Sequence, residues 1–205
     1  MGRAIRGMLW LVLAAGLALL VGLCARYYTA DEGPVELKYD DGTTEVHNAP
    51  REDDSGGQCA VMFTPSFYPA RLKEVSFFVT KLGRPKTKFR VRVYKGGGEN
   101  GGPGTSLLQA EVFASAEGAN EWVKVDLSSR NITIDSGDFF VAMEWATAAG
   151  KEGDMAQHLG TDRSSPDGRS WWKWAKKEQW QPIERIGTGG MRDLMIRATV
   201  VSLPK

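Results

Sequence analysis

Four of the seven tryptophans in this 205-residue sequence fall within ten residues, interleaved with basic side chains. A tryptophan combines a large apolar ring with one hydrogen-bond donor, so exposed tryptophans stack on sugar rings, anchor protein contacts or lie at a membrane interface. On a strand, Trp172 and Trp174 would share one face and Trp171 and Lys173 the other, so part of this cluster is expected in the core. The candidate binding residues of the cluster are Trp171, Trp172, Trp174 and Trp180.

A second candidate surface is a run of seven basic residues, between positions 81 and 95, that contains no acidic residue. On a strand, Lys86, Lys88, Arg90 and Arg92 would share one face, with side chains two residues apart separated by about 6.6 Å. Such a row is either a solvated face that blocks edge-to-edge aggregation or a docking stripe. As a docking stripe it would bind an anionic surface: lipid headgroups, an acidic polysaccharide or an acidic partner.

Two further patterns could suggest a ligand site but have simpler explanations as connections between strands. The glycine-rich residues 96–104 lack the Gly-Lys-Ser/Thr ending and the following helix of a phosphate-binding loop, so they are predicted to connect strands. Six aspartates could supply oxygen ligands for calcium, but none follows the spaced pattern of a calcium loop. We therefore expect no cofactor, with a structural calcium as the alternative on Asp40, Asp41, Asp53, Asp54, Asp162 and Asp167.

Catalytic signals are weak. The histidines, His47 and His158, are far apart in the sequence and belong to no motif, and no Gly-x-Ser-x-Gly elbow is present. Two cysteines exclude a disulfide-dense scaffold, and Cys59 is expected to be a small buried hydrophobe. These observations predict a protein that is not an enzyme, while a hydrolase with unidentified carboxylates stays open as a third hypothesis.

The sequence around these residues has the pattern of β-strands. Apolar residues alternate with a period of two, and Asp-Gly, Ser-Gly and Gly-Gly turn signals separate the runs. No window after residue 30 carries a helical stripe. Eight to ten such strands predict an all-β domain, a jelly-roll-like β-sandwich. The clearest alternating runs are residues 75–79, 89–93, 123–127, 139–145 and 194–200.

The amino terminus is of a different kind. Residues 8–25 carry no charge and would span roughly 27 Å as a helix, close to the thickness of a bilayer's hydrocarbon core. This stretch is longer than the apolar part of a secretory signal, so we predict an uncleaved signal-anchor. A cleaved signal and a lipoprotein anchor at Cys24 are the alternatives. The membrane segment would be formed by Met8, Leu9, Trp10, Leu11, Leu13, Leu17, Leu19, Leu20 and Leu23.

Flanking charge sets the predicted orientation. Arg3 and Arg6 precede the segment, which predicts a cytoplasmic amino terminus and a β domain in the periplasm or at the cell surface. The predicted organisation is an anchor over residues 1–30, a linker over 31–34 and an extracytoplasmic domain over 35–205. The net charge of +1 argues against nucleic acid as a partner.

Nine short phrases follow one another along the chain, at residues 37–43, 63–65, 68–72, 89–94, 101–105, 122–127, 137–141, 165–170 and 193–198. Together they resemble a jelly-roll-like accessory domain of secreted and cell-surface bacterial proteins, a family often found beside peptidase or glycosidase domains. The resemblance implies a non-catalytic module that binds a surface, a glycan or a neighbouring protein, and it carries over no catalytic residue. In place of a neighbouring enzyme domain this sequence shows the apolar segment, so we expect a stand-alone anchored subunit.

Together these features predict a membrane-anchored, extracytoplasmic binding module. The leading hypothesis is an accessory or structural subunit of a membrane or envelope assembly, with a protein as its partner. The alternative is a carbohydrate-binding module that uses an exposed tryptophan cluster.

Overall fold

The computed structural model describes residues 33–50, 53–148, 150, 155–164, 167–174, 179–183 and 192–204. The predicted membrane segment, residues 8–25, lies outside the described residues. In the described part of the chain, no helix is long and apolar enough to cross a membrane. Its regular elements are fourteen strand segments and two 3-10 turns, η1 (Glu99–Gly101) and η2 (Ser128–Arg130), so the predicted all-β fold is confirmed.

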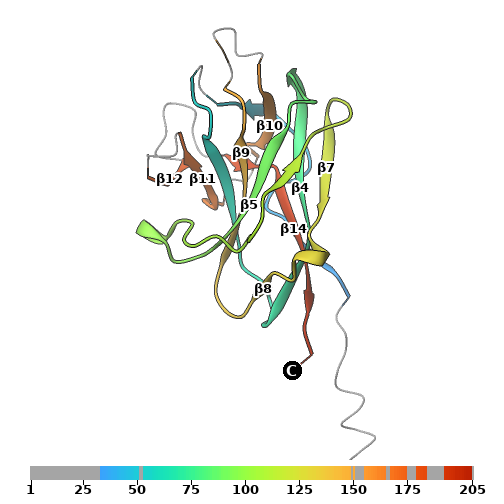
Figure 1. Ribbon diagram of the computed structural model, residues 1–205, viewed down its shortest axis with the longest axis vertical. Coiled ribbons are helices and arrows are strands. Elements are labelled where there is room, and N and C mark those ends of the chain that lie inside the picture. Colours follow the sequence, from blue (N-terminus) through green and yellow to red (C-terminus); the bar gives the residue numbers. More distant parts are fainter. Residues whose placement is uncertain are drawn as a thin grey trace, which may run out of the picture. The chain divides into compact units, whose positions relative to one another are not determined.

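The first sheet is built around its longest strand, β4, and all its pairings are antiparallel. Its main path runs in the order β1 (Val35–Leu37), β14 (Ile196–Ser202), β4 (Ala70–Gly83), β10 (Gln157–Asp162) and β13 (Asp193–Leu194). Three more strands pair with this path: β2 (Val46–Asn48) with β10, and β7 (Glu121–Asp126) and β8 (Thr133–Ile134) with β4. Figure 1 shows β4, β7 and β14 side by side.

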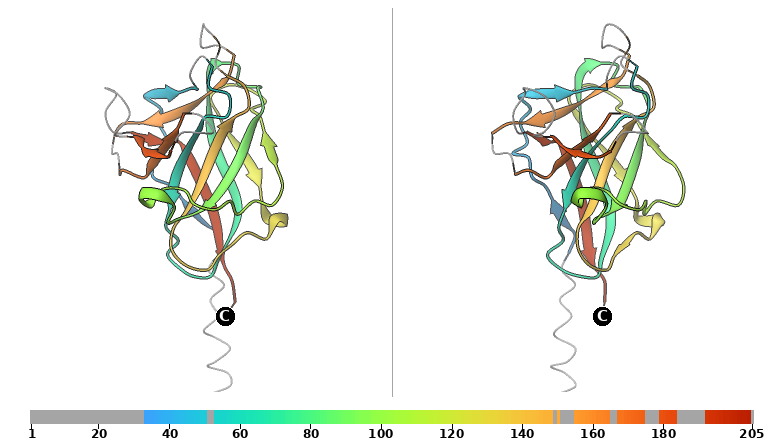
Figure 2. Two further views of the ribbon diagram at one scale, coloured as in Figure 1. Left: turned by 60° about the vertical axis from the view of Figure 1, so that its left-hand side comes forward. Right: turned by 90° about the vertical axis from the view of Figure 1, so that its left-hand side faces the viewer.

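The second sheet has six antiparallel strands. Their order is β12 (Gln181–Pro182), β11 (Ser170–Lys173), β3 (Gln58–Phe63), β9 (Phe139–Trp145), β5 (Phe89–Lys95) and β6 (Val112–Ala114). In the turned views of Figure 2, β3, β5 and β9 run along the long axis in front of β4 and β14. The chain therefore forms two facing layers.

The core lies between the two sheets because each strand buries alternate side chains. In β5, Phe89, Val91 and Val93 are buried, while Arg90 and Arg92 point to the other face and stay partly exposed. Phe89 meets Phe77 of β4 edge to face across the layers, with ring centroids 5.1 Å apart. The period-two pattern in the sequence thus identified the core face of this strand correctly.

In β4, a β-bulge shifts the alternation of buried and exposed residues by one position. Thr199 pairs with Glu74 but Val200 pairs with Leu72, so one residue of β4, Lys73, is unmatched. The extra residue lets Leu72 and Val75 both face the core although they are three positions apart.

The central strand β9 is buried on both faces, at every one of its seven residues. Cys59 of the adjacent β3 is a free cysteine, and its burial in the core raises the pKa of its thiol. It therefore acts as a small apolar core residue, as predicted. Since β9 is also buried on the face that points away from the core, further side chains must cover that outer face.

Candidate functional site

The tryptophan cluster is divided between the two faces of β11, as the strand period predicts. Trp172 faces the core and is 2% exposed, with its ring centroid 5.1 Å from that of Trp145 and 4.6 Å from that of Trp174. Trp171 and Lys173 lie on the outer face of the second sheet. The core therefore accounts for Trp172, and Trp174 packs against it.

On the outer face, four aromatic side chains form a second apolar cluster. Trp171 meets Phe140 edge to face at 5.9 Å between centroids, and Tyr94 meets Trp180 in the same geometry at 6.0 Å. Trp171 and Phe140 are buried, whereas Tyr94 and Trp180 are half-buried and reach solvent. We call Tyr94, Phe140, Trp171 and Trp180 the outer aromatic cluster.

The glycine-rich loop covers part of this cluster. It connects β5 to β6, as predicted for residues 96–104, and its tip lies against the ring of Trp171: a Cβ added to Gly102 would stand 2.9 Å from Trp171 Cζ3. One side-chain hydrogen bond joins the loop to the chain before β12, from Gln179 Nε2 to Glu99 Oε1 at 2.9 Å. The backbone approach that Gly102 permits explains why Trp171 is buried on an outer face.

A buried carboxylate, Glu144, organises the polar half of this face. Arg90 Nη1 donates to one of its oxygens at 2.8 Å, and Arg92 Nε donates to the other at 2.7 Å. Gln58 Nε2 also donates to Glu144 at 3.2 Å, while Tyr94 Oη donates to Gln58 Oε1 at 2.7 Å. This network connects the outer aromatic cluster to a set of side chains with fixed orientations.

The electrostatics of the network keep Glu144 charged. Burial alone would raise the pKa of Glu144, but the hydrogen bonds and charges of Arg92 and Arg90 outweigh it and hold that pKa below its ordinary value. Lys173 lies beside the network with its Nζ 5.1 Å from the centre of the Trp180 ring, and burial lowers the pKa of its ammonium group. Glu144 is therefore a permanent hydrogen-bond acceptor at neutral pH and a poor general acid.

The predicted basic row is not one uniform surface. Arg90 and Arg92 lie on β5, already paired with the buried carboxylate, and they also approach Glu111 at 3.3 and 3.8 Å. Lys86 and Lys88 precede β5 and are exposed. Of these four residues, only Lys86 and Lys88 carry a charge that no carboxylate of the described residues neutralises.

The aspartates proposed for calcium have several different environments. Asp40 accepts two hydrogen bonds from Arg197, at 2.6 and 3.1 Å. Ligand oxygens of Asp41, Glu45 and Asp162 lie within 4.8 Å of one another, and the backbone N–H of Asp41 donates to Asp162 Oδ2 at 2.7 Å. These three carboxylates have the chemistry to hold a hard cation, so a structural calcium remains a prediction.

Strand pairing brings the two histidines together, which their sequence separation did not indicate. His47 in β2 pairs with Gly160 in β10, two residues beyond His158, and the imidazole centroids are 4.9 Å apart. Burial and the charge of His158 both lower the pKa of His47. The pair is a local ring contact between two strands.

Two facing antiparallel sheets define the chain as a β-sandwich domain, and one outer face carries aromatic and ion-paired side chains. No protein-family model matches the sequence. Among curated proteins, Bacillopeptidase F of Bacillus subtilis (strain 168) is 29% identical over 177 residues, a match that covers 82% of this chain and 11% of that protein. The chain thus spans about one tenth of the length of this relative.

Solved structures show the same fold. The cysteine protease and lectin-like domains of Cwp84, a surface-layer-associated protein of Clostridium difficile, match with a TM-score of 0.51 and 16% identity, over 73% of this chain and 32% of that one. A clostridial Cwp84 structure obtained after propeptide cleavage matches with a TM-score of 0.56 and 13% identity, over 84% of this chain and 41% of that one. At these identities the similarity concerns the fold.

Proposed function

We propose that this chain is a non-catalytic cell-surface module that binds a glycan on the outer face of its second sheet. The observation that carries the proposal is the half-buried pair of Tyr94 and Trp180, which lies beside Lys173 and the Glu144 network. A sugar ring presents an apolar face to an aromatic side chain and hydroxyl groups to polar ones. The outer face offers both, and the polar groups are already held in place.

The comparisons support the same class of function. One of the solved structures contains a lectin-like domain of a surface-layer-associated protein. The chain corresponds to 11% of Bacillopeptidase F and to 32% and 41% of the two Cwp84 chains, so it has the extent of an appended domain. A hydrolase is less well supported, because both oxygens of the buried carboxylate on the outer face already accept hydrogen bonds from arginines.

Tryptophan fluorescence tests the glycan proposal. The full chain in mild detergent is titrated with a panel of soluble polysaccharides, and at least one is expected to change the emission saturably. Trp180→Ala is expected to weaken that binding at least about tenfold, as for an aromatic hot spot. The matched control is Trp122→Ala, which removes a partly exposed tryptophan from β7 of the first sheet and should leave binding unchanged. Equal affinities of the Trp180 variant and the wild type would contradict the proposal.

A second candidate function is the accessory subunit of a membrane or envelope assembly, with a protein partner. The uncharged residues 8–25 favour it, because a retained anchor would hold the domain beside other membrane proteins. A pull-down of the tagged full chain from its own membranes, with intact mass on the eluate, separates the two candidates. A stoichiometric partner together with an uncleaved chain supports the subunit, whereas a lone or cleaved chain counts against it.

A further inference from the structure

An open groove of about 770 Å³ lies at the end of the sandwich where β4 turns into β5. One wall is the turn that follows β4, with Lys81, Arg84 and Lys86, and the other is the loop before β7, with Glu117 and Ala119. The volume falls within the usual range of ligand sites, roughly 300–1,000 Å³.

Hydrogen bonds hold both walls. The Arg84 N–H donates to Ala156 O at 3.0 Å, and the Lys81 N–H donates to Asn120 Oδ1 at 2.9 Å, which ties one wall to the other. Glu121 accepts the backbone N–H groups of Glu117 and Gly118 at 2.6 and 3.0 Å. The groove is therefore set in place before any ligand binds.

The groove carries positive charge that the protein itself does not neutralise. Lys81, Arg84 and Lys86 are exposed, and within the described residues none of them forms an ion pair. Arg90 and Arg92, a few residues further on, do form ion pairs. Three cations lie near two carboxylates, Glu117 in the lining and Glu121 behind it, so a local excess of positive charge remains in a chain whose net charge is only +1.

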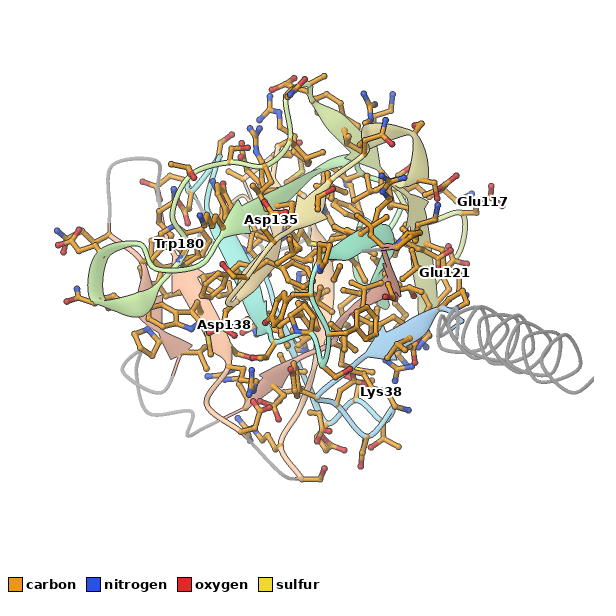
Figure 3. All side chains as sticks on the ribbon, turned by 90° about the horizontal axis from the view of Figure 1, so that it is seen from below. Lys38, Glu117, Glu121, Asp135, Asp138 and Trp180 are labelled. Atoms are coloured by element: carbon orange, nitrogen blue, oxygen red, sulfur yellow. The ribbon has the colours of Figure 1, made fainter. Side chains whose placement is uncertain are left out.

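The groove is remote both from the outer aromatic cluster and from the point where the chain enters the domain. Viewed along the long axis in Figure 3, Glu117 and Trp180 lie on opposite sides of the molecule. Val35 pairs with Val200, which is level with Leu72 at the start of β4. From Leu72 to Gly83 the strand extends about 36 Å, at about 3.3 Å per residue, so the groove is at the opposite end.

We propose that this groove binds an anionic polysaccharide, at a site separate from the proposed glycan face. Charge complementarity requires an anionic ligand. A flat bilayer cannot enter a groove that lies between two walls. The described lining has no aromatic side chain to anchor a protein contact. A flexible chain of charged sugars can lie in the groove and place its anionic groups on the three cations.

The test measures binding of the full chain, held in neutral-lipid nanodiscs, to dextran sulfate and to uncharged dextran of equal length. Only the sulfated polymer is expected to bind at the groove. Each cation that contacts the polymer releases condensed counterions into solution. With three cations, the affinity for dextran sulfate should therefore fall about 20-fold between 50 and 200 mM salt. Lys81→Glu, Arg84→Glu and Lys86→Glu together should abolish most of the salt dependence and weaken binding at least tenfold, while Trp180→Ala should leave both unchanged.

The matched control reverses three exposed charges that do not line the groove: Lys38→Glu, Lys95→Glu and Arg130→Glu. This triple variant changes the net charge by the same amount, and its affinity for dextran sulfate should stay within twofold of that of the wild type. Equal losses in the two triple variants would overturn the proposal in favour of bulk charge, and no loss in either would overturn it outright. Binding to phosphatidylglycerol vesicles or polyglutamate that depends on the groove and matches that to dextran sulfate would assign it to a membrane or an acidic protein instead.

Discussion

Glu144 holds the outer face together at the scale of single residues. Its side chain is 2% exposed and bonded to two arginines, each with a quarter of its side chain exposed. The sequence offered a signal for it: one carboxylate within the apolar run of residues 139–145, and two arginines within the run of residues 89–93. The register that sets Arg90 opposite Glu144 depends on strand pairing, which a single sequence does not specify.

Glu144→Gln is expected to destabilise the fold by about 2–4 kcal/mol in urea unfolding at pH 7, because it leaves two partly buried arginines without their shared anion. The pKa of Glu144 is lower in the folded chain than its ordinary 4.5. Its contribution is therefore complete above pH 4.5 and is lost as the pH falls through the lower folded value. Glu111→Gln is the control, since Glu111 is 55% exposed and should cost under about 0.5 kcal/mol. Equal costs for both variants would contradict this account.

Asp193 gives the opposite dependence on pH. It is 1% exposed, and burial together with the nearby charge of Asp167 raises its pKa to about 7. The folded chain then binds a proton that the unfolded chain has released, so stability falls as the pH rises from about 4 to 7. Asp193→Asn should flatten this part of the curve, gaining up to about 4 kcal/mol over wild type at pH 8 and almost nothing at pH 4. Parallel stability curves for the two proteins would show that Asp193 does not titrate in this way.

At the scale of elements, the glycine-rich loop determines how much of Trp171 solvent can reach. Gly102→Ala places a methyl group 2.9 Å from Trp171 Cζ3, too close for the tip to keep its position. The loop should move away from Trp171, which lowers the free energy of unfolding by about 1–3 kcal/mol. Acrylamide should then quench tryptophan emission more strongly than in the wild type. Gly33→Ala is the control, because nothing lies within 4 Å of its added Cβ. Unchanged quenching in the Gly102 variant would show that the loop does not limit access.

The elements also show where prediction from sequence succeeds. Alternation identified β5 and β7 and the core face of each, since a half-buried strand repeats every two residues. It also located β9, although that strand is buried on both faces. Two features escaped it: the bulge at Lys73, which shifts the phase within β4, and Met195, which separates β13 from β14 in a run that looks continuous. Both arise from pairing with neighbouring strands.

At the scale of the whole molecule, the sequence predicted the all-β fold and the division of Trp171 from Trp172. It did not predict that the glycine-rich loop would cover Trp171, or that Lys86 would line a groove with Lys81 and Arg84. Such contacts join segments of the chain that only the packed sandwich brings together. The molecule consequently has two separate candidate surfaces, one aromatic and one basic.

A glycan bound on the outer face would contact the indole ring of Trp180. The most direct measurement is a ¹H–¹⁵N spectrum of the full chain during titration with the best polysaccharide of the panel, in which Trp180→Ala assigns the Trp180 indole signal. This signal is expected to shift saturably. The indole of Trp145, which donates to Gln157 O at 2.9 Å inside the core, should stay fixed. Saturable binding that leaves the Trp180 signal in place would contradict the account.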